Sequence, residues 1–237
     1  MRGEPINIQV VRHGDTERTG ESPDITEIGR SELEVTANKI ARQIHENEYV
    51  VFWVSPTART LDSAKFLLDQ LSEKNIKARE RIKVVGNLVE KGKTEQRMRS
   101  QYPDDTPINL LDTYIENRAP LEIKQTKERQ NDFEKRLKRV FYFAAKLTQI
   151  EERQNGVPHL IMVTHDVTLS TILLHANLIR KGDEIPTGAL ISIRIEEGNQ
   201  RNYYKVLIGY NNKFANLRFS NLDNKIIPNQ KVDIVEL

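Results

Sequence analysis

The sequence predicts a three-layer α/β sandwich: a mainly parallel sheet with an antiparallel edge, helices on both faces and a helical cap insertion. Two observations lead to this prediction. Short apolar runs at residues 6–11, 50–54 and 159–164 alternate with longer segments whose apolar residues recur at helical spacing. Near the carboxyl end, two stretches rich in β-formers are separated by Gly198 and Asn199, which is typical of a hairpin.

The composition excludes several classes of protein and of site. A chain of 237 residues can build a full core, and we expect a single domain over residues 1–237. The net charge of +2 gives no reason to expect a nucleic-acid partner. There are no cysteines, so disulfides and thiolate chemistry are excluded. No apolar run is long enough for a signal peptide or a membrane span, so we expect a cytoplasmic protein with no membrane contact.

The first half of the chain predicts three strands and two helices. The strand over residues 6–11 ends just before Arg12 and His13, and a polar loop follows. Thr26 is expected to cap a helix that runs to about residue 46. The run at 50–54 is apolar throughout, which predicts a strand buried on both faces. A helix over 58–71 and a weaker strand over 82–85 come next.

The second half begins with a stretch, residues 91–127, that is broken by three prolines and rich in charge. We expect it to be an insertion that caps the core. A long helix over 133–147, a buried strand over 159–164 and a further helix follow. Strands over 191–196 and 203–210 are expected to pair, and the polar tail from residue 214 is expected to lie along the surface.

Three of the predicted strands are followed by residues suited to phosphate chemistry. Because the carboxyl ends of parallel strands lie at one edge of a sheet, these residues are expected to meet there. Guanidinium groups bind phosphate through two parallel hydrogen bonds, and a neutral imidazole is a nucleophile toward phosphorus. Cations beside the histidines would repel a metal ion, so no metal site is predicted. The residues are Arg12, His13, Ser55, Arg59, His165 and Asp166.

Four segments give the chain a resemblance to a known family. They read RHGDT at 12–16, ITEIGR at 25–30, SPTART at 55–60 and VTHD at 163–166. Their order and spacing, over roughly the first 190 residues, are similar to those of the histidine phosphatase superfamily, which has the phosphoglycerate-mutase-like fold. A single match of this kind is weak evidence, whereas four in register are strong.

The resemblance implies roles for individual residues. His13 would be the residue phosphorylated in the reaction intermediate. The side chains that would hold the phosphoryl oxygens are Arg12, Thr16, Arg59 and His165. Thr19 stands where mutases of the family have an asparagine, and it would replace that asparagine's phosphate contact only imperfectly.

The resemblance leaves the proton donor open between two carboxylic acids. The segment at 88–90 (LVE) matches the one that supplies the acid in the mutase-like branch, which favours Glu90. In the acid-phosphatase branch the donor directly follows the second histidine, where this chain has Asp166. Asp166 is also a plausible helix N-cap, and Glu90 alone would be an ordinary loop carboxylate. Either residue would need a raised pKa to act as an acid near neutrality.

Two departures from the family pattern bear on activity. Arg18 and Thr19 stand in place of a tryptophan–asparagine pair, and the residues after Glu90 (KGKTE) lack the usual tryptophan–glutamate–glycine segment. Both argue against a phosphoglycerate mutase. The sequence therefore predicts a metal-independent and cofactor-independent phosphatase of phosphomonoesters. The alternatives are a phosphomutase and a catalytically weak phosphate-binding or interaction module. The expected substrate is a phosphorylated small molecule or a phosphopeptide, and a homodimer is left open.

Overall fold

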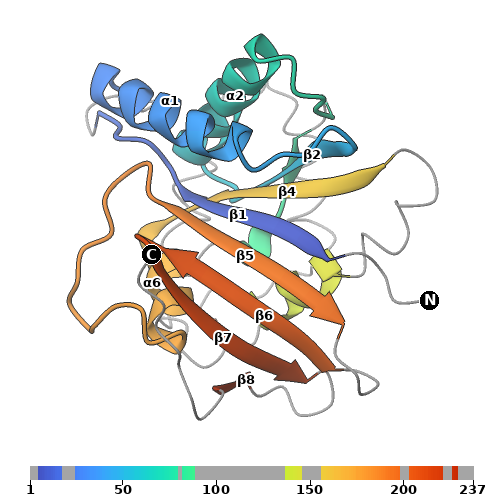
Figure 1. Ribbon diagram of the computed structural model, residues 1–237. Helices are drawn as coiled ribbons and strands as arrows, with labels where there is room; N and C mark the ends of the chain where they lie inside the picture. Colours follow the sequence, from blue (N-terminus) through green and yellow to red (C-terminus); the bar gives the residue numbers. More distant parts are fainter. Residues whose placement is uncertain are drawn as a thin grey trace, which may run out of the picture.

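A computed structural model describes residues 5–17, 25–79, 82–88, 137–145, 156–197, 203–220 and 226–228. It confirms the predicted α/β class (Figure 1). The predicted cap at 91–127 lies outside the described residues, so the cap and the single-domain organisation stay predictions. None of the helices within the described ranges is long and apolar enough to cross a lipid bilayer.

One sheet of eight strands organises the described residues, in the order β3-β2-β4-β1-β5-β6-β7-β8. The strands β3, β2, β4 and β1 run parallel to one another, and from β1 onward every pairing is antiparallel. The antiparallel part is therefore wider than the hairpin that the sequence predicts. The strands are β1 Ile6–Arg12, β2 Glu48–Val54, β3 Lys83–Val84, β4 Val157–Thr164, β5 Leu190–Glu197, β6 Tyr203–Tyr210, β7 Lys213–Ser220 and β8 Ile226–Pro228.

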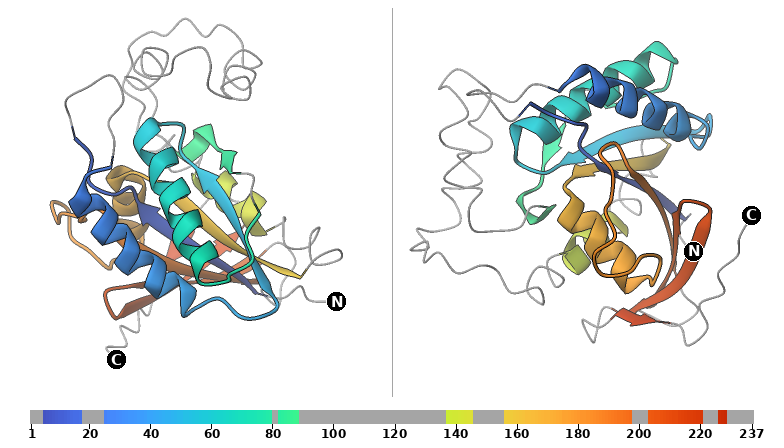
Figure 2. Two further views of the ribbon diagram at one scale, coloured as in Figure 1. Left: turned by 90° about the horizontal axis from the view of Figure 1, so that it is seen from above. Right: turned by 90° about the vertical axis from the view of Figure 1, so that its left-hand side faces the viewer.

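Helices cover both faces of the sheet (Figure 2). The helices α1 (Glu27–Ala41) and α2 (Ala58–Glu73) pack on one face, and α6 (Asp166–His175) packs on the other together with a helical segment at 137–145. Each face has its own apolar core because successive strand residues point to opposite sides. In β4, for example, Ile161 packs in the core under α1 and α2, whereas Met162 packs in the core with α6.

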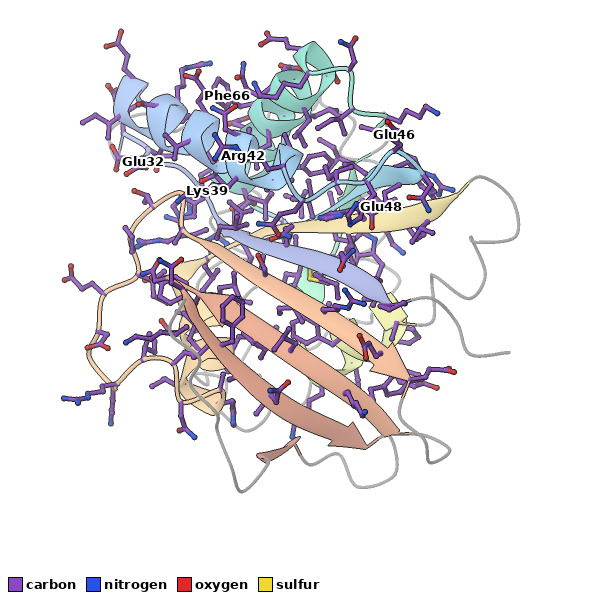
Figure 3. All side chains as sticks on the ribbon, in the orientation of Figure 1. Glu32, Lys39, Arg42, Glu46, Glu48 and Phe66 are labelled. Atoms are coloured by element: carbon purple, nitrogen blue, oxygen red, sulfur yellow. The ribbon has the colours of Figure 1, made fainter. Side chains whose placement is uncertain are left out.

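The connection from α1 to β2 is held by Glu48. Its carboxylate accepts hydrogen bonds from the backbone N–H of His45 (2.9 Å), from Nδ1 of His159 (3.1 Å) and from the Asn7 amide (2.9 Å). Burial alone would raise the pKa of Glu48, but these hydrogen bonds lower it to about 2. Figure 3 shows Glu48 at the β2–β4 end of the sheet. Helix α1 ends at Ala41 rather than near residue 46 as predicted, because the N–H groups that follow do not continue the helical pattern: that of Gln43 donates to the Ile40 carbonyl, and that of His45 donates to Glu48.

The tail from residue 214 was predicted to lie along the surface, and this is wrong for residues 214–220, which belong to strand β7. Of the rest of the tail, only the short strand β8 is among the described residues. Strand β7 pairs with β6 over its whole length, and Ala215 and Leu217 are buried. The turn consists of Asn211 and Asn212, which both adopt positive φ (46° and 61°). A two-residue hairpin turn with the right twist needs positive φ at both positions, and asparagine tolerates it better than most residues. The Asn–Asn pair is the sequence feature that could have predicted this hairpin.

Truncation of Leu217 tests whether β7 packs against the core rather than lying loosely on the surface. Leu217→Ala should lower the free energy of unfolding by about 2–5 kcal/mol because the side chain packs in the core with α6. The neighbouring Asn216 is exposed, so Asn216→Ala should change it by only about 0.5 kcal/mol. Urea unfolding of both variants makes the comparison, and equal small effects would contradict the placement of β7.

Candidate functional site

The carboxyl ends of β1, β2 and β4 bring the predicted site residues side by side. The ladders pair Arg12 with Thr164 and Val54 with Val163. Each ladder continues for one residue more: the His13 N–H donates to the Thr164 carbonyl (3.0 Å), and the Ser55 N–H donates to the Val163 carbonyl (2.9 Å). These backbone bonds place the residues that follow each strand at a common edge, as the parallel pattern predicted.

His13 and His165 lie next to each other in this edge. Both are buried, with 6% and 7% of their surface exposed, and their ring centroids are 5.3 Å apart in an edge-to-face arrangement with an interplanar angle of 67°. The structure therefore brings together the two histidines that are 152 positions apart in the sequence, 165 minus 13. Within the part of the chain that the structure describes, each ring has one hydrogen-bond partner, and the partner differs between the two.

The partner of His13 determines which of its nitrogens carries the proton. Nδ1 lies 2.8 Å from the Gly14 carbonyl oxygen. A carbonyl can only accept, so Nδ1 carries the hydrogen and donates it. In a neutral imidazole the other nitrogen, Nε2, then has the free lone pair. Nε2 of His13 is thus the ring nitrogen with the lone pair that a nucleophile needs.

The surroundings of both histidines favour the neutral ring. Burial and the nearby charge of Arg59 lower the pKa of His13 to about 4, and Arg12 adds to this, while the bond to Gly14 and the charge of Asp166 act in the opposite direction. Burial, Arg59, His13 and Arg12 lower the pKa of His165 to about 2. Near neutral pH both rings are uncharged, and the positive charge of the site resides on the arginines.

Arg12 is held by the segment that leads into β5. Its Nη1 donates to the Ile185 carbonyl, and its backbone N–H donates to the Ala189 carbonyl (2.9 Å). Arg59 lies in the first turn of α2 and is exposed, and its charge acts on both histidines. Two cations therefore flank two neutral imidazoles.

Two buried polar atoms of this site lack a partner within the described part of the chain. They are Nε of Arg12 and Nδ1 of His165. A third such atom, Nε2 of His159, belongs to β4 and lies away from this site. Buried polar atoms almost always have hydrogen-bond partners, so two unpartnered atoms at one site call for an explanation. A guanidinium nitrogen can only donate. An anion with several acceptor oxygens would satisfy it and would be attracted by both arginines.

Helices α1 and α2 both hold the loop that follows His13, through contacts that sequence analysis missed. The Gly14 N–H donates to the Ser63 hydroxyl (3.1 Å), and Thr26, which caps α1 as predicted, donates its hydroxyl to Asp15 (2.9 Å). Glu32 accepts from the Asp15 N–H (3.3 Å) and from the Thr187 hydroxyl (2.8 Å). Figure 3 shows Glu32 between α1 and the connection that enters β5. No local pattern marks this residue, because both contacts depend on tertiary structure.

The remaining predicted site residues differ in what the structure reveals. Thr16 is partly buried and forms an isolated bridge with Ile25, and its role as a phosphate ligand stays a prediction. Asp166 does not cap α6, as His165 takes the N-cap position and Asp166 begins the helix. One Asp166 oxygen accepts from the Val167 N–H (2.8 Å), and the other lies 4.0 Å from Nη2 of Arg12.

Glu90 and Thr19 lie outside the described residues. Leu88, two residues before Glu90, is the last described residue of this segment. Its carbonyl accepts hydrogen bonds from the hydroxyls of Thr164 (2.6 Å) and Thr168 (3.0 Å). The described residues contain no group of three or more histidine, aspartate or glutamate side chains that could hold a metal ion.

Comparison with known proteins identifies the family. A model of the histidine phosphatase superfamily (branch 1) matches residues 8–202. The match covers most of the chain, and the chain therefore belongs to this superfamily, as the four segments indicated. Curated protein sequences gave no match.

Solved structures share the fold at low sequence identity. Mycobacterial hydrolase 2 aligns with 14% identity over 84% of this chain and 85% of its own, with a TM-score of 0.51. Phosphoglycerate mutase from Bacillus anthracis aligns with 14% identity over 81% and 88%, with a TM-score of 0.48. The protein histidine phosphatase SixA, complexed with tungstate, aligns with 14% identity over 93% and 100%, with a TM-score of 0.45.

The neutral histidines make stability depend on pH. In the unfolded chain their pKa returns to about 6.5, so below that pH the unfolded state binds protons that the folded state binds only near pH 4 and pH 2. Acidification should therefore lower the free energy of unfolding, by about 1.4 kcal/mol per pH unit for each histidine. Between pH 6.5 and pH 5, the free energy of unfolding should fall less in His165→Gln than in the wild type. Urea unfolding in phosphate-free buffer measures both. Equal losses in the two proteins would contradict the neutral burial of His165.

Proposed function

We propose that the protein is a phosphomonoesterase that works through a phosphohistidine on His13 and needs no metal ion. The observation that supports this is the state of His13, a neutral ring with its hydrogen on Nδ1 and its lone pair on Nε2. It lies beside two buried atoms that have no hydrogen-bond partner among the described residues and that an anion would satisfy. A nucleophile next to a site for a doubly charged anion is the arrangement that phosphoryl transfer requires.

The proposed reaction has two steps. In the first, Nε2 of His13 attacks phosphorus, the P–O bond to the alcohol breaks, and a carboxylic acid, Glu90 or Asp166, protonates the leaving oxygen. In the second, water attacks the phosphohistidine, the P–N bond breaks and the carboxylate accepts a proton of that water. Inorganic phosphate leaves, and both groups return to their starting states. The two arginines and His165 stabilise charge on the phosphoryl oxygens throughout.

The proposed substrates are phosphorylated small molecules or phosphopeptides. Contacts to the phosphoryl oxygens are the same for both, so they do not discriminate between the two classes. Discrimination must come from residues that contact the alcohol part of the substrate. A phosphate-release screen over metabolites and phosphopeptides separates the classes, and analysis of where the phosphate goes distinguishes transfer to water from transfer to a second hydroxyl.

Removal of the nucleophile is the first test. His13→Ala should reduce release of phosphate from an aryl phosphate by about 1,000-fold or more, because the covalent route is lost. His45 is exposed and remote from the site, so His45→Ala is the matched control and should keep wild-type activity. Full activity in His13→Ala would refute the proposal. Tight phosphate binding without turnover in the wild type would instead favour a binding module.

The identity of the proton donor is testable with amide variants. The donor's variant, Glu90→Gln or Asp166→Asn, should lower kcat on an alkyl phosphate by about 10²–10⁴-fold because its leaving alkoxide must be protonated. The first half-reaction on an aryl phosphate with an acidic phenol should be much less affected, since that leaving group needs no proton. The other variant should stay close to wild type. Unchanged alkyl phosphate kinetics in both variants would exclude both residues.

A further inference from the structure

Ser55 makes the one identified hydrogen bond of the His165 ring among the described residues. Its Oγ lies 3.0 Å from Nε2 of His165, and the Ser55 side chain is fully buried. The serine backbone is held from both sides: its N–H donates to Val163 (2.9 Å), and its carbonyl accepts from the Thr60 hydroxyl (2.5 Å). The hydroxyl is thus placed against His165 by the register of β2 on β4 and by the first turn of α2.

The direction of this hydrogen bond determines what His165 can do. A neutral imidazole has a single N–H, on one nitrogen or the other. If Ser55 accepts, the hydrogen is on Nε2, and Nδ1 presents a lone pair that would repel phosphoryl oxygens. If Ser55 donates, the hydrogen is on Nδ1, and His165 can donate to an oxygen of the anion. A hydroxyl can do either because its hydrogen rotates.

Nδ1 of His165 is the atom for which this choice matters. It is buried and has no partner within the described residues. The ring lies against His13, and the charges of Arg59 and Arg12 act on it, so it borders the same site as the nucleophile. An anion placed there offers only acceptor oxygens. Such an anion favours an N–H over a lone pair at Nδ1 and thereby requires a donor at Nε2.

We propose that, with phosphate in the site, Ser55 donates its hydroxyl hydrogen to Nε2 of His165 and thereby holds the ring in the tautomer with hydrogen on Nδ1. Ser55 is then a positioning residue: it does not touch the phosphoryl group but makes His165 a donor to it. The proposal rests on the proposed function only in taking the anion to be a phosphoryl group. The tautomer itself can be measured without turnover.

The experiment is ¹⁵N NMR of histidine-labelled full-length protein, with inorganic phosphate as the probe. His165 is assigned from the spectrum of His165→Gln. At saturating phosphate and neutral pH, the wild type should show His165 as a neutral ring protonated at Nδ1. Ser55→Ala should shift it toward the Nε2-protonated tautomer and weaken phosphate binding about tenfold, which corresponds to the loss of one buried hydrogen bond. Ser55→Thr keeps the hydroxyl and should restore both properties.

Two results would overturn the proposal. One is a wild-type His165 that, with phosphate bound, is an imidazolium or carries its hydrogen on Nε2; this result needs no variant to fold. The other is a folded Ser55→Ala protein with an unchanged tautomer and unchanged phosphate affinity. Failure of the proposed function looks different: phosphate binds with the expected tautomer, but no phosphate is released from any ester. Turnover by a protein with the opposite tautomer would contradict only the role of Ser55.

Discussion

The site depends on the parallel register of β4 against its two neighbours. Because β4 lies between β1 and β2, a single strand sets the positions of His13 on one side and of Ser55 on the other. The ladders continue through the bonds from His13 to Thr164 and from Ser55 to Val163. A shift of one residue in either pairing would turn the following side chains to the opposite face. Burial of β4 on both faces opposes such a shift, since every residue of the strand is buried.

The positive charge beside the histidines depends on how Arg12 is held in place. Arg12 donates to carbonyls of the segment before β5, which is itself held to α1 by the bonds from Thr36 to the Gly188 carbonyl (2.6 Å) and from Thr187 to Glu32. Gly188 has a φ of +68°, and a Cβ there would meet Glu32 at 2.8 Å, so the close contact with α1 needs glycine. Burial, together with the charges of Arg59 and Arg12, lowers the pKa of both imidazoles and keeps them neutral, which preserves the lone pair of His13.

The sequence was sufficient to predict the parallel part of the sheet and to predict that four side chains of the candidate site lie close together. Apolar runs separated by helical patterns predicted β1, β2 and β4, and the rule that parallel strands end at one edge brought together Arg12, His13, Arg59 and His165. It was not sufficient where geometry depends on distant partners. Glu32 and Thr187 lie 155 positions apart, and only the folded chain joins them. The Asn211–Asn212 turn was local, but its composition is a weaker turn indicator than a pair that contains glycine, so β7 was missed.

The two histidines share one environment but differ in their hydrogen-bond partners, which suits the two different roles that we propose for them. Both rings are buried, both are neutral, and the same arginines act on them. What differs is the partner: a backbone carbonyl at Nδ1 of His13, and a hydroxyl at Nε2 of His165. The carbonyl can only accept, so the hydrogen bond places the hydrogen on Nδ1 of His13 and leaves the lone pair on Nε2, as the proposed reaction requires. The hydroxyl can reverse its direction, so the tautomer of His165 can respond to the anion. In the proposed reaction, a partner that can only accept thus suits His13, which would form the bond to phosphorus. A partner that can either donate or accept suits His165, which would have to donate only while phosphate is present.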